Sequence, residues 1–168
     1  LSTPALRALK AANPDARLEM LVPERVAHFV KRLPYVDVVH TMALGYGGTP
    51  GRMFRDAGML LELRRKRFDL ALNMRTLVSE KSAKKIRFLL SVIGAKKTGG
   101  RNTDGYGDFF DVQVPERYIG DKYEMEYDIE LVKALGYGVD SREVDLPLDE
   151  RDSSGVSWML DEAGIGND

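Results

Sequence analysis

An arginine lies at a point in the sequence where an anion could bind. Arg75 follows residues 69–74 (DLALNM), a run that predicts a strand. Open α/β sheets bind ligands at the carboxyl ends of their strands, where a guanidinium can form paired hydrogen bonds to a phosphate or carboxylate. The alternative interpretation is a solvated loop arginine.

The next segment carries hydroxyls and lysines at the start of a predicted helix. Ser79, Lys81 and Ser82 lie in its first turn, and Lys84 and Lys85 follow one turn later. The free amide groups of a helix N-terminus favour an anion, so this segment is a second candidate site. A merely solvated basic helix face is the alternative.

A third basic candidate, Arg101, follows Gly99 and Gly100 and precedes Tyr106. Glycines let a backbone approach a ligand closely, and arginine and tyrosine are frequent contact residues. We therefore expect Arg101 to lie on a loop within reach of an anion. A surface loop without a ligand is the alternative.

Several classes of site are excluded or disfavoured. The sequence has no cysteine and two histidines, which removes disulfides, thiolate catalysis and Cys-ligated zinc. The spacing of Asp104, Asp108 and Asp111 does not fit a calcium loop, so no metal and no cofactor are predicted. In the glycine-rich run 45–51, Pro50 occupies the third glycine position of a dinucleotide fingerprint, and the run predicts a flexible connection.

Charge is segregated along the chain although the net charge is −1. Residues 52–101 carry a net charge of +10, whereas residues 102–168 carry −13. A basic middle segment indicates an anionic partner, and mutual screening of the two segments across the fold is the alternative. The sequence shows no membrane span and no apolar leader, and with the absence of cysteine this favours a cytoplasmic protein.

Strands and helices are predicted to alternate. Apolar spacing and capping residues predict helices that begin near Ser2 or Thr3, after Pro23, near residue 53, before Ile86, at 124 and at 156, and strands at 18–22, 36–42, 69–74, 96–99 and 111–114, with 143–148 extended. This alternation predicts an α/β fold, a Rossmann-like doubly wound and mainly parallel sheet in one domain over residues 1–168.

One strand is missing from this order. A doubly wound domain normally begins with a central strand whose following turn and helix hold the ligand, whereas this sequence opens directly into a helix. We expect the absent strand to lie between the strands at 18–22 and 69–74. The chain would then be a fragment with two unpaired interior strand edges.

Several segments resemble, in order, those of glycosyltransferase family 9, the ADP-heptose:lipopolysaccharide heptosyltransferases. The matching segments are residues 2–10 (STPALRALK, after the family's Gly-Asp turn), 13–16, 67–72, 93–100 and 123–136. The resemblance implies a GT-B enzyme of two Rossmann-like domains. This chain would be the N-terminal, acceptor-binding domain, truncated at both ends and lacking its first strand and the C-terminal donor domain.

The resemblance also implies a reaction. Heptose, or a related sugar, would pass with inversion from a nucleotide sugar of the ADP-heptose type to a phosphorylated glycolipid of the lipopolysaccharide core or another cell-envelope acceptor. The general base would be an aspartate just upstream of Leu1, so this chain would hold no catalytic residue and be inactive alone. The whole enzyme would work in the cytoplasm, without a metal or cofactor, peripherally on the inner membrane.

Site residues carry over position by position. Thr3 and Pro4 match the helix start beside the base; the loop and helix start that line the acceptor cleft match Arg75, Ser79, Lys81 and Ser82; and Arg101 matches a basic position that faces the acceptor's phosphates. One departure concerns a histidine and an arginine of the family, which are replaced here by Tyr123 and Tyr127.

Two other functions compete with this interpretation. A stand-alone Rossmann-like nucleotide or anion module without catalysis would need an intact first strand and phosphate loop. A nucleic-acid binder would use residues 52–101, but their aromatic residues Phe54, Phe68 and Phe88 fall largely on predicted core stripes. We therefore expect no nucleic-acid partner.

Overall fold

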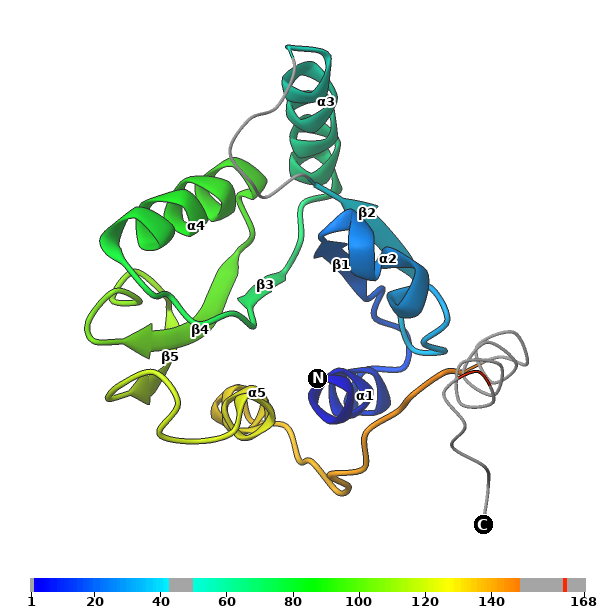
Figure 1. The fold of residues 1–168 in the computed structure, drawn as a ribbon, viewed down its shortest axis with the longest axis vertical. Helices are drawn as coiled ribbons and strands as arrows, with labels where there is room; N and C mark the ends of the chain where they lie inside the picture. Colours follow the sequence, from blue (N-terminus) through cyan, green and yellow to red (C-terminus); the bar gives the residue numbers. More distant parts are fainter. Residues whose placement is uncertain (1, 43–49, 149–161, 163–168) are drawn as a thin grey trace.

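The computed structural model describes residues 2–42, 50–148 and 162 and has the predicted α/β class (Figure 1). Its elements, in chain order, are α1 (Thr3–Ala12), β1 (Glu19–Val22), α2 (Glu24–Val30), β2 (Val38–Thr41), α3 (Pro50–Lys66), β3 (Leu70–Asn73), α4 (Glu80–Ile93), β4 (Lys97–Thr103), β5 (Val112–Glu116) and α5 (Glu124–Ala134). The glycine-rich run up to residue 49 and most of the helix predicted at 156 lie outside the described residues.

The strands form two parallel sheets rather than one. Strand β1 pairs with β2, and β3, β4 and β5 pair in that order. Within the described residues, β1 and β3 each pair along one edge only, and they face each other across the middle of the molecule (Figure 1). The break falls where the sequence predicts a missing strand.

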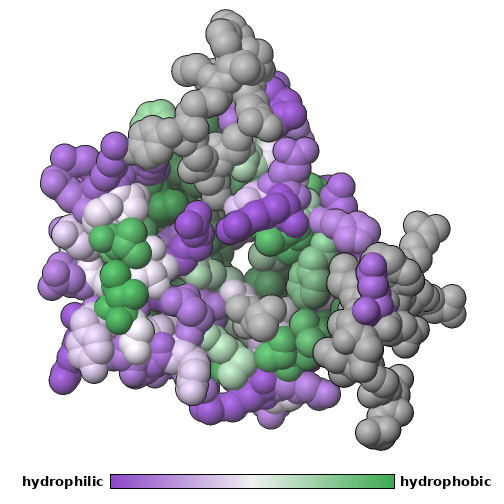
Figure 2. Space-filling view, viewed as in Figure 1, coloured by the Kyte–Doolittle hydropathy of each residue, from purple (hydrophilic) through white to green (hydrophobic). Residues whose placement is uncertain are grey.

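Helices and side chains connect the two sheets. Helix α1 packs against α5, and Met74 at the end of β3 packs against the core of the first sheet, which includes Leu6 and Val22. Figure 2 shows a hollow at the centre of this face with hydrophobic side chains on its walls. The two halves therefore share an apolar centre although their strands do not pair.

Local signals for helix ends are confirmed. Pro4 lies in the first turn of α1, and Asn13 ends that helix. Ser79 and Ser82 form a reciprocal capping box at the start of α4, and Gly94 ends it in the left-handed conformation at φ 67°.

Strand β4 is longer than the sequence predicts, and its glycines have a packing role. A Cβ on Gly99 would lie 2.9 Å from a Leu72 methyl carbon, and a Cβ on Gly100 would lie 2.5 Å from the Phe110 ring. The segment that joins β4 to the parallel strand β5 has no helix, and its residue Phe110 packs against Leu77 instead. The prediction of a loop at Arg101 is therefore wrong, because these glycines make room for a side chain rather than for a ligand.

The segment predicted to be extended, residues 143–148, forms no strand in the structure. Arg7 of α1 donates to the Asp145 carboxylate at 2.7 Å and to the Glu143 carbonyl at 2.9 Å. Tyr35 donates its hydroxyl to the same Asp145 at 2.9 Å. These side-chain contacts fix the segment beside α1 without strand pairing.

Candidate functional site

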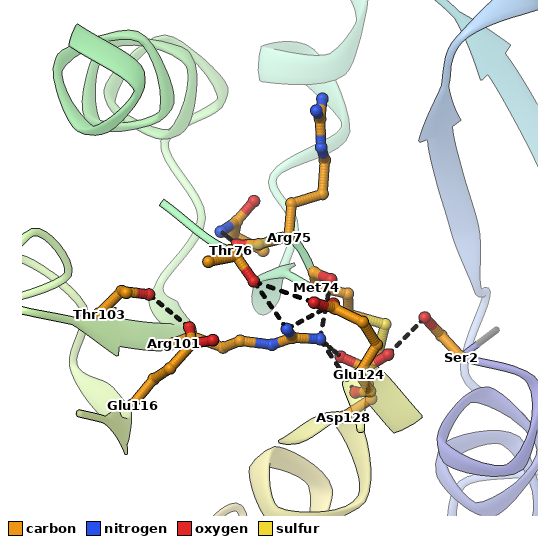
Figure 3. A network of polar contacts seen from close by, with 10 residues as sticks. Ser2, Met74, Arg75, Thr76, Arg101, Thr103, Glu116, Glu124 and Asp128 are labelled. Atoms are coloured by element: carbon orange, nitrogen blue, oxygen red, sulfur yellow. Dashed lines mark hydrogen bonds and ion pairs between the residues drawn. The ribbon is translucent and has the colours of Figure 1, made fainter. Parts of the chain in front are cut away.

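A buried guanidinium lies where β3, β4, α1 and α5 meet. Arg101 of β4 has no exposed surface and donates to Asp128 Oδ1 at 2.9 Å and to Glu124 Oε2 at 2.5 Å (Figure 3). It also donates to the Thr76 hydroxyl at 2.9 Å and to the Glu124 carbonyl at 3.0 Å. Its terminal nitrogens are thus held by protein partners, so a ligand could reach them only by displacing one.

Asp128 joins this cluster to the start of α1. The Ser2 hydroxyl donates to Asp128 Oδ2 at 2.5 Å, across 126 positions of sequence. Burial raises the pKa of Asp128, an effect that the hydrogen bonds of Ser2 and Arg101 offset in part. Burial disfavours the charged form of Arg101, but the bonds and charges of Asp128 and Glu124 outweigh it and raise the pKa of the guanidinium.

Tyr127 completes the surroundings of the guanidinium. Its ring lies 4.9 Å from Arg101 Cζ, a cation–π distance, and the residue is 1% exposed. Tyr123, by contrast, is 84% exposed and lines an open hollow with Gly120–Lys122 and Glu126. Of these two tyrosines, Tyr127 is therefore a core residue and Tyr123 is a surface residue.

Thr3 and Pro4 are buried, as the start of α1 packs into the fold. The Thr3 hydroxyl accepts a hydrogen bond from the Asp145 amide at 3.1 Å. Both residues therefore pack inside the fold at the start of α1, and neither presents a side chain at the surface.

Arg75 is exposed and lies just past the carboxyl end of β3, as its position in the sequence predicts. Among the described residues, no hydrogen bond or ion pair engages its guanidinium, and Figure 3 shows the side chain pointing away from the Arg101 cluster. The Asn73 amide donates to the Arg75 carbonyl at 2.6 Å and fixes the backbone there. An available cation on a fixed backbone is suited to an anionic ligand.

The start of α4 lies close to Arg75 in sequence. The Ser79 hydroxyl accepts from the Ser82 amide at 3.2 Å, and the Ser82 hydroxyl accepts from the Ser79 amide at 3.0 Å. These hydroxyls stabilise the start of the helix. Because the Ser82 amide already donates to Ser79, fewer amide groups are available to an anion than the sequence predicts. Lys81 is exposed on the first turn.

The sequence interpretation missed three members of the cluster: Ser2 as a donor to α5, and Glu124 and Asp128 as partners of Arg101. Asp128 occupies the interior of an amphipathic helix, between Tyr127 and Ile129, which are both buried. A carboxylate flanked by core residues is a signal for a buried ion pair, but it does not identify the partner.

The described part of the chain lacks two kinds of feature. It contains no group of three or more histidine, aspartate or glutamate side chains placed to hold a metal ion. None of its helices is both long and apolar enough to cross a membrane.

Comparison with solved structures identifies similar folds, although no protein-family model and no curated protein sequence matches this chain. The glycosyl transferase family 9 protein from Veillonella parvula aligns with 99% of this chain and 46% of its own length, at 16% identity and a TM-score of 0.66. Escherichia coli ADP-heptose lps heptosyltransferase II aligns with 99% of this chain and 47% of its own, at 18% identity and a TM-score of 0.55.

Escherichia coli heptosyltransferase WaaC, solved with ADP, aligns with 86% of this chain and 45% of its own length, at 21% identity and a TM-score of 0.62. The chain thus spans less than half the length of each of these structures. The resemblance seen in the ordered sequence segments is confirmed at the level of the fold. The chain has the half-size α/β fold found within the glycosyltransferases of family 9.

Proposed function

We propose that the chain is the acceptor-binding domain of an inverting glycosyltransferase. The whole protein transfers heptose or a related sugar from a nucleotide sugar of the ADP-heptose type to a phosphorylated glycolipid of the lipopolysaccharide core or another cell-envelope acceptor. The donor binds mainly to a second domain, outside this chain. The protein works in the cytoplasm, peripherally on the inner face of the bacterial inner membrane.

The observation that carries this proposal is the exposed Arg75 at the carboxyl end of β3, in a fold shared with family 9 enzymes. The carboxyl ends of parallel strands are where open α/β sheets bind ligands. A guanidinium that no described residue engages, at that edge, suits the phosphates of the acceptor. Lys81 on the neighbouring helix start adds a second exposed cation.

The remaining acceptor-side residues support this surface from beneath. We assign a positioning role to Thr3, Pro4 and Arg101, because all three are buried. Arg101 donates to the Thr76 hydroxyl, one residue from Arg75. It also donates to Asp128, which in turn accepts from Ser2 at the start of α1. Ser79 and Ser82 fix the first turn of α4, which carries Lys81.

The experiment measures donor and acceptor affinity of the whole protein after Arg75→Ala. Loss of a charged hydrogen bond of about 1.5–3 kcal/mol should raise the acceptor's Kd about tenfold or more. Donor Kd should change little, because the donor binds to the other domain. Arg65→Ala is the matched control, since Arg65 is exposed in the last turn of α3, before β3 begins.

Three results would count against the proposal. Unchanged acceptor affinity in Arg75→Ala would remove Arg75 from the site. Equal losses of donor and acceptor affinity would indicate a folding defect instead of a lost contact. Nucleotide binding by the whole protein without any sugar transfer would favour a non-catalytic binding module.

A further inference from the structure

The outer face of α4 combines a phenylalanine with three lysines. The core side of this helix is defined by its buried residues, Ala83, Leu90 and Ile93. Helical periodicity places Lys81, Lys84, Lys85 and Phe88 on the opposite side, and all four are exposed. We call these four residues the lysine–phenylalanine face, and Figure 1 shows that α4 lies at the periphery of the molecule.

Phe88 is unusually exposed for its position on a packed helix. Its exposed fraction is 66%, and Lys84 and Lys85 lie one turn before it. The sequence interpretation placed Phe88 on a core stripe, and the structure contradicts that placement. An aromatic ring exposed to water has an unfavourable hydration free energy. Transfer of the ring into an apolar phase removes this unfavourable contribution.

The charge of this face is positive. Glu80 is the acidic residue on the same helix, and it pairs with Lys84 at 2.7 Å. Both side chains of this pair are more than 70% exposed, so water and salt screen it strongly and Lys84 stays available to other anions. A face with excess lysine around an exposed aromatic ring matches an anionic lipid surface, because lysines bind headgroups while the ring enters the interface.

The face also follows the candidate acceptor site closely in the sequence. Helix α4 begins just after Arg75 and Thr76, and the intervening Val78 is 60% exposed. A protein that rests on α4 would therefore hold Arg75 close to the bilayer surface. Nucleic acid fits this face less well, since a single exposed ring offers no series of stacking platforms.

We propose that the lysine–phenylalanine face docks onto an anionic lipid bilayer and so presents the Arg75 edge of the domain to a membrane-embedded acceptor. The bilayer docking itself stands on the α4 face, whereas its purpose rests on the proposed function. The surface contributes to binding through its lysines and through insertion of the Phe88 ring.

The test is co-sedimentation of the whole protein with phosphatidylcholine vesicles, with and without phosphatidylglycerol. Each lysine near an anionic surface is worth about a fivefold change in partition, so Lys84→Gln/Lys85→Gln should weaken binding about 30-fold. Phe88→Ser should weaken it about tenfold. The matched controls are Lys133→Gln and Ile119→Ser, which alter an exposed lysine and an exposed apolar residue on other surfaces and should bind as the wild type does.

Transfer to a soluble, delipidated acceptor separates this inference from the proposed function. Phe88→Ser and Lys84→Gln/Lys85→Gln should leave that transfer unchanged while lowering transfer to vesicle-embedded acceptor. Absence of transfer in the wild type with intact vesicle binding would refute the proposed function alone. Four results would overturn the docking inference. The wild type could fail to bind vesicles, or bind neutral and anionic vesicles equally. The variants of the lysine–phenylalanine face could bind vesicles as the wild type does, or lose binding to RNA alone.

Discussion

Replacing Asp128 by alanine should destabilise the fold far more than its single carboxylate suggests. Arg101 is fully buried, and Asp128 is its buried charge partner, at 2.9 Å. Because a guanidinium cannot lose its proton, the variant would leave a buried cation whose remaining charged partner among the described residues is Glu124, with a side chain that is 60% exposed. Removing one partner of a buried pair costs about 3–5 kcal/mol, and the remaining Glu124 places the expected loss near 3 kcal/mol.

The converse variant should behave differently with pH. Arg101→Met leaves Asp128 buried without its cation, and a carboxyl group can take up a proton where a guanidinium cannot release one. Burial already raises the pKa of Asp128, and loss of the cation raises it further. A raised folded pKa gives stability that is present at low pH and lost as pH rises through that pKa. Arg101→Met should therefore recover towards wild type on acidification, whereas Asp128→Ala should not.

The assay is urea unfolding followed by far-ultraviolet circular dichroism at several pH values. A loss of 3 kcal/mol in a chain of 168 residues corresponds to a fall in Tm of about 6–12 °C. The double variant Arg101→Met/Asp128→Ala should cost at least about 2 kcal/mol less than the sum of the single variants, because neither charge is left unpaired. Glu124→Gln is the exposed control and should cost about 1 kcal/mol or less.

Either of two results would refute this reasoning. If Asp128→Ala unfolds within about 1 kcal/mol of wild type, the pair is not a buried determinant of the fold. If the single losses add in the double variant, the two side chains do not act as a unit.

Three further predictions concern other parts of the chain. Gly100→Ala should lower the free energy of unfolding by about 1–3 kcal/mol, because the new methyl would meet the buried Phe110 ring. Gly58→Ala, on the open face of α3, should instead raise it by about 0.5–1 kcal/mol. Equal effects of the two variants in urea unfolding would contradict the packing explanation. The Glu19 side chain on β1 is 4% exposed and accepts hydrogen bonds from His40 and Lys66. Burial raises the pKa of Glu19, but these hydrogen bonds outweigh it and lower the pKa, so as pH drops below about 4.5 the wild type should lose more stability than Glu19→Gln does. Parallel pH profiles of Tm for the two proteins would disprove this. Adding roughly 12 residues that precede this chain in the whole protein should fill the space between β1 and β3, raise Tm and reduce self-association in light scattering, and an unchanged, monomeric chain would show that our strand order is wrong.

Local sequence signals predicted the order and type of the elements. Apolar periodicity identified all five described helices, and caps such as Ser79 and Gly94 were identified because they act within one turn of the chain. The position of Arg75 after a predicted strand was also sufficient to place it at the carboxyl end of β3. The gap between β1 and β3 was inferred from connectivity alone, since a doubly wound order requires a strand before the first helix.

Contacts between distant segments decided the rest. Glycines beside Arg101 have the composition of a loop, yet they form β4 because Phe110, ten positions after Gly100, fills the space that a Cβ would occupy. The role of Arg101 depends on Asp128 and Thr76, which lie 27 and 25 positions away, and on Ser2 beyond them. Sequence determined which groups could carry charge and where helices begin and end, because those properties are local. Only the tertiary structure decided that Arg101 is buried and paired while Arg75 and Phe88 face solvent, because burial depends on which segments pack over a side chain.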